Sequence, residues 1–383
     1  MSAPRNILVV FGTRPEAIKL APVIQRLRRE PDSFRVAVCA TAQHREMLDQ
    51  VTGLFGIVPD IDLDLMRPDQ ALNELAARSF EALDRVLRER AADWLLVQGD
   101  TTTALCAGLA AFHRRIPVAH VEAGLRTGDL SRPFPEEMNR RVVDLVAAAA
   151  FAPTARAATA LASEGVPMGR VHVTGNTVVD ALLQIADRQG SVPQEDVVLI
   201  TAHRRESFGQ PMERVVRAVA RLAAAFPATR FVHVAHPNPN VLQTIRQNAG
   251  LANVELREPV DYDEMVRLLR RCRLVLTDSG GLQEEAPTFC KPVLVLREKT
   301  ERPEGIEAGL ARLVGTDEEA IVLAASRLLR DPAELEAMAD AGNPYGDGRA
   351  SDRIADVLAG RPFAPFEPVS RGARSESRRR IAS

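Results

Sequence analysis

The sequence predicts an α/β fold of two doubly wound domains that face a central cleft. Three observations support this prediction: short β-rich runs alternate with helical stretches, the runs are continuously apolar, and the alternation starts again after Val171. Strands separated by helices imply right-handed crossovers and parallel sheets. Continuously apolar strands are typical of sheets that are covered on both faces. Both domains are therefore expected to be Rossmann-like.

The strands are expected at residues 7–11, 34–40, 94–98, 118–121, 197–201, 231–235, 254–256, 274–277 and 293–296. The turn Thr174-Gly175-Asn176 separates the two series, so we assign residues 1–172 to the N-terminal domain and 173–346 to the C-terminal domain. A closing helix within residues 347–360 is expected to pack back on the N-terminal domain. Residues 361–383 are rich in Pro, Ser and Arg, which predicts a disordered basic tail.

The composition limits the classes of partner. A chain of 383 residues is long enough for two domains. Its 49 basic and 51 acidic side chains nearly balance, so neither nucleic acid nor a membrane surface is an expected partner. The cysteines form no C-x-x-C pair and are interpreted as reduced packing residues, not as zinc ligands or disulfides. The apolar run before Gly12 is too short for a signal peptide or a membrane span, so a cytoplasmic location is expected.

An anion site is predicted where the apolar run 274–276 gives way to Thr277-Asp278-Ser279-Gly280-Gly281 and then to an acidic helix. Glycines allow close approach to the backbone, and the first turn of a helix directs unpaired N–H groups at a phosphate. Glu285, one turn further on, can accept a hydrogen bond from a ribose hydroxyl. The pattern favours a nucleoside diphosphate, although an ordinary helix start explains it about equally well.

Charged side chains follow several other strands of the predicted sheets. In the first half, Gly12-Thr13-Arg14-Pro15-Glu16 ends one strand, and Asp100 and Glu122 end two more. Carboxyl ends of parallel strands meet at one sheet edge, where catalytic groups of such folds lie. Asp100 can instead be a helix N-cap, and Arg14 can be a solvated side chain.

Further candidate residues have two interpretations. Glu136 and Glu137 open a helix, where negative charge is favoured in any case. His203 and Arg204 follow the first strand of the second half and can face a diphosphate. A histidine such as His236, which also ends a strand, is more often a hydrogen-bonding group of a turn.

Taken together, these segments resemble the non-hydrolysing UDP-N-acetylglucosamine 2-epimerases of bacteria, which are similar to two-domain GT-B glycosyltransferases. The matching segments are Gly12-Thr13-Arg14-Pro15-Glu16, Gly99-Asp100-Thr101-Thr102-Thr103, residues 120–130, Pro135-Glu136-Glu137, His203-Arg204-Arg205-Glu206, residues 278–285 and Glu301-Arg302-Pro303-Glu304. They occur in order between residue 5 and about residue 360. The resemblance implies interconversion of UDP-N-acetylglucosamine and UDP-N-acetylmannosamine, a homodimer, and supply of precursors for cell-surface polysaccharide.

The resemblance also implies roles for individual residues. It assigns catalysis to Asp100, Glu122, Glu136 and His203. It assigns substrate and UDP binding to Arg14, Lys19, Met265, Ser279, Gly280, Gly281, Glu285 and Arg302. It places a second, activating nucleotide sugar near Gln43, Gln70, Glu136, Arg204 and His236. Asp69 and Glu46 depart from the residues that such members carry, and Met265 replaces a common aromatic residue.

Sugar chemistry favours a mechanism without a cofactor. C2 of the hexose is not α to a carbonyl, so its proton needs prior activation. Oxidation by NAD is disfavoured because no G-x-G-x-x-G follows a predicted strand. Expulsion of UDP to give 2-acetamidoglucal needs only carboxylates and cations, so neither metal nor NAD is expected. The alternatives are a hydrolysing 2-epimerase, a GT-B glycosyltransferase and a silent nucleotide-sugar sensor.

Overall fold

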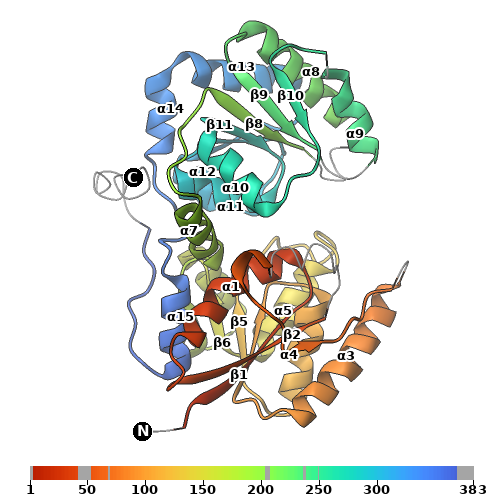
Figure 1. Cartoon of the computed structure of the whole chain (residues 1–383), viewed down its shortest axis with the longest axis vertical. Helices are drawn as coiled ribbons and strands as arrows, with labels where there is room; N and C mark the ends of the chain where they lie inside the picture. Colours follow the sequence, from red (N-terminus) through yellow and green to blue (C-terminus); the bar gives the residue numbers. More distant parts are fainter. Residues whose placement is uncertain are drawn as a thin grey trace. The chain divides into compact units, whose positions relative to one another are not determined.

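The computed structural model describes residues 3–41, 53–67, 70–202, 208–235, 239–248 and 250–368, without the side chains of residues 239–241. The chain divides into two compact units, which we describe separately. The first unit contains residues up to Ala181 together with Gly346–Glu367, and the second contains Leu182–Tyr345. Each has a parallel sheet with helices on both faces (Figure 1).

The described strands of the first unit follow the order β3-β2-β1-β4-β5-β6-β7, and all neighbours are parallel. They are β1 (Arg5–Phe11), β2 (Phe34–Ala40), β3 (Ile61–Asp62), β4 (Trp94–Gln98), β5 (Val118–Val121), β6 (Ala147–Ala152) and β7 (Val171–Val173). The order reverses between β1 and β4. Ligands bind at such a switch point in doubly wound sheets, beside the carboxyl ends of the strands.

Helices enclose this sheet because its strands are apolar on both faces. The helices of the first unit are α1 (Arg14–Arg28), α3 (Leu72–Glu89), α4 (Thr102–His113), α5 (Glu136–Val146), α6 (Ala155–Ser163) and α15 (Ala350–Ala359), with a 3₁₀ turn at Met168–Arg170. Leu8 and Val10 pack into a core with residues of α3, α4 and α5. Ile7 and Val9, which alternate with them, face the opposite side, where α1 contacts the sheet.

The second unit repeats this arrangement with the strand order β10-β9-β8-β11-β12-β13, again parallel. Its strands are β8 (Val197–Thr201), β9 (Arg230–Val234), β10 (Val254–Arg257), β11 (Leu274–Thr277), β12 (Val293–Val295) and β13 (Ala311–Leu313). Its helices are α8 (Gln210–Ala225), α9 (Pro239–Ile245), α10 (Tyr262–Arg271), α11 (Gly280–Glu285), α12 (Pro303–Glu307), α13 (Glu318–Arg330) and α14 (Pro332–Ala339), with 3₁₀ turns at Arg246–Asn248 and Ala286–Phe289. The order reverses between β8 and β11, which precedes the predicted anion site.

All the strands expected from the sequence are present, within two residues of their predicted bounds where these differ. The prediction omitted β3, β6, β7 and β13. Strand β6 has the sequence Ala-Ala-Ala-Ala-Phe-Ala, which favours a helix by intrinsic propensity. It is a strand because it fills the position between β5 and β7, where small side chains pack beneath the helices.

The boundary between the units differs from the predicted one at residue 172. It falls between Ala181 and Leu182, within α7 (Thr177–Gln189). The first turns of α7 are tied to α15, because Asp180 accepts hydrogen bonds from the Ser351 N–H at 2.8 Å and the Ser351 hydroxyl at 2.6 Å. Helix α15 belongs to the first unit and contacts α1, with Arg26 and Asp352 paired at 2.6 Å.

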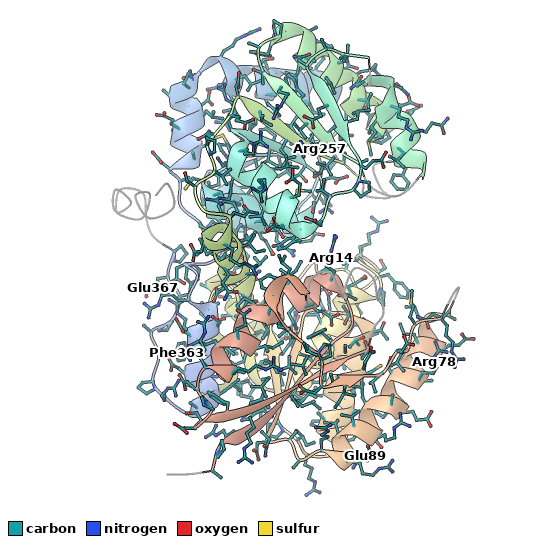
Figure 2. The ribbon with its side chains drawn as sticks, viewed as in Figure 1. Arg14, Arg78, Glu89, Arg257, Phe363 and Glu367 are labelled. Carbon is teal, nitrogen blue, oxygen red and sulfur yellow. The ribbon has the colours of Figure 1, made fainter. Side chains whose placement is uncertain are left out.

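The predicted disordered tail begins too early at residue 361. The Phe366 ring is only 4% exposed, and its N–H donates to the Val173 carbonyl at 2.9 Å. Phe363 contacts the His172 ring, with centroids 5.7 Å apart (Phe363 is labelled in Figure 2). Residues 361–367 are thus a packed extension of the first unit, and residues beyond 368 lie outside the described range. Within that range, none of the helices is both long and apolar enough to cross a membrane.

Candidate functional site

The first unit presents charged residues at the carboxyl ends of β1, β4 and β5. Arg14 is the first residue of α1, directly after the β1 turn, and lies half-buried at the start of that helix (Figure 2). Asp100 follows β4 and Glu122 follows β5. Because these strands are parallel neighbours, the sheet brings the predicted residues to one edge.

Glu122 is held in a charged and mostly buried setting. Its carboxylate pairs with Lys19 from α1, and the two side chains are 6% and 12% exposed. Asn176 also donates a hydrogen bond to it at 3.1 Å. Glu122 has a φ of 65°, a left-handed conformation that is strained in a residue with a side chain. Lys19, predicted as a substrate-binding residue, is therefore also the partner of a catalytic candidate.

Asp100 is the second carboxylate with a cationic partner. It pairs with Arg140 of α5, a residue that the sequence reasoning missed. The Asn139 amide donates to the Asp100 carbonyl at 2.8 Å. Asp100 does not cap α4, because Thr101 is the cap and accepts from the Ala104 N–H at 3.0 Å. The Asp100 carboxylate is 22% exposed and can reach a bound molecule.

The adjacent acids Glu136 and Glu137 have different environments. Glu137 is fully buried and accepts from the N–H groups of Thr127 and Gly128 at 3.1 and 3.3 Å, so it holds the loop that follows β5. Glu136 is the first residue of α5 and is only half-buried. Of the two, Glu136 is the more exposed.

A buried network behind the carboxylates was not expected from the sequence. The His120 ring bridges the Asp144 carboxylate at 2.6 Å and the Gly99 carbonyl at 2.7 Å. Asp144 also pairs with Arg126 at 2.8 Å. Burial alone would raise the pKa of Asp144, but the charges of His120 and Arg126 lower it overall. A histidine inside an apolar strand was the only sequence signal for this network.

Glu16 is a second buried acid near the site. It accepts hydrogen bonds from the N–H groups of Gly12 and Thr13 at 3.0 and 2.7 Å and from the Thr101 hydroxyl at 2.7 Å. Burial raises its pKa to about 7, against the lowering effect of these hydrogen bonds. Glu16 thereby joins the turn after β1 to the turn that carries Asp100.

The sequence suggested that Gly12 gives the turn after β1 its conformational freedom. In the structure, close packing around this position is what requires a glycine. A Cβ atom there would lie 2.3 Å from the Thr41 hydroxyl and 2.5 Å from the Thr103 hydroxyl. Those hydroxyls bond each other at 2.9 Å beneath the β1 turn. Any side chain at Gly12 would push the turn away from α4.

In the second unit, the predicted anion site opens α11. Ser279 is the N-cap residue, and its own N–H donates to the Thr277 hydroxyl at 2.9 Å. Neither Gly280 nor Gly281 has a positive φ, so the backbone conformation does not itself require glycine. Gly281 is exposed, and a Cβ there would meet protein atoms only at 3.8 Å. The glycine therefore leaves open space above the start of the helix.

Glu285 lies at the end of α11 and accepts a hydrogen bond from the Tyr262 hydroxyl at 3.3 Å. Tyr262 begins α10 and was missed by the sequence reasoning. Met265 is half-buried one turn further along α10. Residues three apart share a helix face, so Met265 and Tyr262 lie on the side of α10 that contacts Glu285.

Arg302 is held by an acidic partner and by its backbone. Its guanidinium pairs with Glu284 of α11, and its carbonyl accepts from the Tyr345 hydroxyl at 3.2 Å. Burial would raise the pKa of the neighbouring Glu301, but the charges of Arg302 and Arg297 lower it to about 2. This charge cluster fixes the segment after β12 against α11.

Several predicted residues cannot be placed. His203, Arg204, His236 and Gln43 lie outside the described residues, as do Glu46 and Asp69. Gln70 is described, and its carbonyl oxygen accepts a hydrogen bond from Arg78 of α3. Within the described ranges, no three His, Cys, Asp or Glu side chains are grouped to hold a metal ion.

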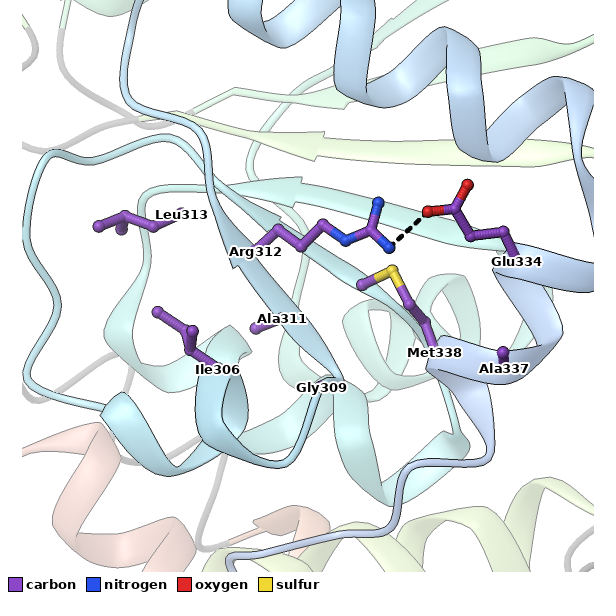
Figure 3. A pocket seen from close by; sticks show the side chains of 8 residues that line it. All are labelled: Ile306, Gly309, Ala311, Arg312, Leu313, Glu334, Ala337 and Met338. Atoms are coloured by element: carbon purple, nitrogen blue, oxygen red, sulfur yellow. Dashed lines mark hydrogen bonds and ion pairs between the residues drawn. The ribbon is translucent and has the colours of Figure 1, made fainter. Parts of the chain in front are cut away.

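A cavity of about 590 Å³ lies beside β13 and α14 and contains none of the predicted site residues (Figure 3). Its lining consists of Ile306, Gly309, Ala311, Arg312, Leu313, Glu334, Ala337 and Met338. The Arg312–Glu334 ion pair at 2.6 Å satisfies its charged groups. We assign no chemistry to this cavity.

Comparison with known proteins gives the family of this chain. The family model of UDP-N-acetylglucosamine 2-epimerase matches residues 25–359. The chain is 50% identical to the UDP-N-acetylglucosamine 2-epimerase of Salmonella typhimurium, over 92% of this chain and 98% of the relative.

Solved structures are also similar. The Neisseria meningitidis UDP-GlcNAc 2-epimerase bound to UDP-GlcNAc is 44% identical, with a TM-score of 0.86 over 93% of this chain and 100% of that one. The S. aureus MnaA–UDP complex is 42% identical, with a TM-score of 0.84 over 95% of this chain and 100% of the other. The fold is thus that of the two-domain, GT-B-like structures, and the chain belongs to the UDP-N-acetylglucosamine 2-epimerase family.

Proposed function

We propose that the protein interconverts UDP-N-acetylglucosamine and UDP-N-acetylmannosamine by inverting C2 of the hexose. Membership of the family supports this activity. The observation that carries it at the level of residues is a pair of carboxylates, Asp100 and Glu122, that follow adjacent strands and are each paired with a cation. Epimerisation removes a proton from one face of the sugar ring and returns one to the opposite face. It therefore requires two acidic groups, each held in its own position.

The reaction proceeds by elimination and re-addition. The C1–O bond to UDP breaks, UDP leaves with the bonding electrons, and C1 becomes oxocarbenium-like. The C2 proton then passes to a base, and its electron pair forms the C1=C2 bond of 2-acetamidoglucal. Protonation of C2 from the opposite face and return of UDP to C1 give the epimer, so atoms and charge balance without an external oxidant.

We assign the base to Asp100. Arg140 holds its carboxylate in place, and its partial exposure leaves it accessible. Glu122 or Glu136 returns the proton. Glu122 is suited to this role because the Lys19 ammonium holds its carboxylate in a fixed position.

The departing diphosphate needs donors and positive charge. In the second unit, the Ser279-Gly280-Gly281 turn offers backbone N–H groups, and Glu285 offers an acceptor for a ribose hydroxyl. Met265 and Arg302 are assigned to substrate binding in the same unit, and Arg14 of the first unit is also assigned to nucleotide binding. His203 is assigned to the diphosphate, and Gln43, Gln70, Arg204 and His236 to a second, activating nucleotide sugar.

Proton NMR of UDP-N-acetylglucosamine with the enzyme in deuterated water tests the function. We expect deuterium at C2 of both epimers and accumulation of UDP-N-acetylmannosamine without free UDP. Stoichiometric release of UDP and N-acetylmannosamine would identify a hydrolysing enzyme. Binding without deuterium incorporation would identify a sensor.

The reaction needs neither metal nor NAD in this proposal. The rate is expected to be the same after treatment with EDTA and without added nucleotide cofactor. Loss of activity on chelation, restored by a divalent cation, would contradict it.

We further propose a cytoplasmic homodimer that supplies precursors of cell-surface polysaccharide. The cysteines Cys39, Cys106, Cys272 and Cys290 are free thiols, which agrees with a reducing compartment. On the first unit, Phe112 of α4 and Leu145 of α5 are 54% and 73% exposed, and exposed apolar side chains favour association. Sedimentation equilibrium is expected to give twice the chain mass, and a monomer at micromolar concentration would refute the dimer.

A further inference from the structure

The turns that carry Asp100 and Glu122 share a buried support. The Gly99 carbonyl, next to Asp100 in the chain, contacts His120 Nε2 at 2.7 Å. The Gly124 N–H, two residues after Glu122, donates to Asp144 Oδ2 at 3.2 Å. His120 Nδ1 and Asp144 Oδ1 join the two contacts at 2.6 Å. The β4 and β5 turns are thereby linked through two side chains that are 0% and 1% exposed.

The chemistry of the acceptors fixes how this pair is charged. A carbonyl can only accept, so His120 Nε2 carries a proton. The Asp144 carboxylate is also an acceptor, so Nδ1 carries a proton as well, and the ring donates from both nitrogens. The positive ring and the carboxylate then form an ion pair, to which Arg126 adds a second cation. Charge-assisted hydrogen bonds of this kind are strong and directional in a buried site.

The backbone that this pair holds is strained at Glu122 and closely packed at Gly124. Glu122 has a φ of 65°, and Gly124 has a φ of 85° with the Ala157 carbonyl oxygen where a Cβ would lie. Left-handed conformations of residues with side chains persist only where surrounding contacts enforce them. Relaxation of the β5 turn would move the Glu122 carboxylate relative to Asp100.

We infer that His120 and Asp144 are positioning residues, which set the separation of Asp100 and Glu122 for proton transfer at C2. This inference rests on the proposed function. Neither residue needs to touch the substrate, because both act through the backbone on either side of the catalytic candidates. The link is confined to the first unit, whereas the α11 turn assigned to UDP belongs to the second.

His120→Gln is the main test. Glutamine can keep the donor to the Gly99 carbonyl, but it has no second donor for Asp144. His120→Asn makes the complementary change, because its shorter amide can reach Asp144 but not Gly99. We expect kcat to fall about 100-fold in both, as for a misplacement of about 1 Å. KM and the calorimetric affinity for UDP are expected to stay within about twofold of the wild-type values. Differences of this size are usual when a mutation and a binding site are independent of each other.

Asp144→Asn is the conservative variant. Its amide oxygen can still accept from the Gly124 N–H, so we expect a smaller loss of kcat, about 10-fold, with UDP affinity unchanged. Glu164→Gln is the matched control, because Glu164 pairs with Arg126 at 2.7 Å on the outer side of the network and is 34% exposed. Its kcat is expected to equal that of the wild type.

The outcomes separate the inference from the proposed function. A wild type that incorporates no deuterium at C2 refutes the function. A wild type that does so, with unchanged kcat in folded His120→Gln and Asp144→Asn, refutes the inference alone. Parallel losses of kcat, UDP affinity and melting temperature would show a general structural role and would also overturn it. If His120→Gln does not fold, His120→Asn and Asp144→Asn decide by the same criteria.

Discussion

Individual side chains in the first unit have roles that depend on their partners. Asp100, Glu122 and Glu16 are all acidic residues near strand ends, but only the first two are paired with a cation. The described donors to Glu16 are the N–H groups of Gly12 and Thr13 and the Thr101 hydroxyl, all neutral, and burial is the largest influence on its pKa. Proximity to a strand end is thus not sufficient to assign a catalytic role.

Asp100→Asn is expected to abolish epimerisation while UDP still binds. The amide keeps the shape of the side chain and can still accept from Arg140, but it cannot take a proton. A positioned general base contributes about 10²–10⁴-fold, so we expect kcat to fall by at least about 100-fold. NMR exchange at C2 measures the rate and calorimetry the affinity. A variant that retains most of its activity would remove the base assignment.

Glu16→Gln is expected to change how stability depends on pH. The folded pKa of about 7 lies above the unfolded value of 4.5, so the group stabilises the fold fully below pH 4.5, and this contribution is lost as the pH rises through 7. The difference corresponds to about 3 kcal/mol. Because glutamine does not ionise, the stability of the variant relative to wild type should increase between pH 5 and pH 8.

Melting temperatures of both proteins at pH 5, 6, 7 and 8 test this expectation. Glu319→Gln, at a largely exposed residue of α13, controls for general effects of losing a carboxylate. A constant difference between Glu16→Gln and wild type across this range would show that burial does not raise the pKa of Glu16.

At the scale of elements, the turns after the strands require glycine for different reasons. Gly124 and Gly128 both have positive φ, 85° and 81°, so both favour glycine conformationally. A Cβ at Gly124 would lie 2.3 Å from the Ala157 carbonyl oxygen, whereas one at Gly128 would meet nothing within 4 Å. The two sites therefore separate steric crowding from backbone strain.

Gly128→Ala is expected to destabilise the first unit by about 1 kcal/mol, the cost of the left-handed conformation alone. Gly124→Ala should cost at least about 2–3 kcal/mol, because overpacking against a fixed carbonyl adds to that strain. Urea unfolding measures both. Equal losses would show that α6 moves freely away from the β5 turn.

At the scale of the whole molecule, the chain returns to the first unit after completing the second. Residues 346–367 include α15 and the packed extension that ends in Phe366 and Glu367. Arg353 holds this extension, because its guanidinium donates to the Ala364 carbonyl at 2.9 Å and lies 5.8 Å from the Phe366 ring centroid.

Phe366→Ala is expected to destabilise the first unit by about 3 kcal/mol, the usual cost of removing a buried phenylalanine. Glu367→Ala, at the exposed next position, should change stability by less than about 0.5 kcal/mol. Thermal unfolding of the full chain measures both. A neutral Phe366→Ala would mean that the extension does not contribute to the core.

Many of the candidate site residues could be predicted because they lie in short sequence patterns, at the ends of apolar strands or the starts of helices. Asp100, Glu122 and Arg14 follow apolar strands, and Ser279-Gly280-Gly281 opens a helix, so the order of elements placed them correctly within their units. Arg140 lies within α5 and Tyr262 is the first residue of α10, and both were missed because an arginine or a tyrosine at such a helix position usually has no special role. Only tertiary contact makes Arg140 the partner of Asp100 and Tyr262 the partner of Glu285.

The sequence by itself determined the α/β class, the parallel strands and the residues at their ends, since apolar runs and turn residues act over a few positions. The tertiary structure decided what depends on distant partners. It made the alanine run at residues 147–152 a strand, tied residues 173–181 and 361–367 to the first unit, and joined His120 to Asp144. Propensity is worth less than about 1 kcal/mol per residue, so burial and hydrogen bonding to a fixed neighbour override it.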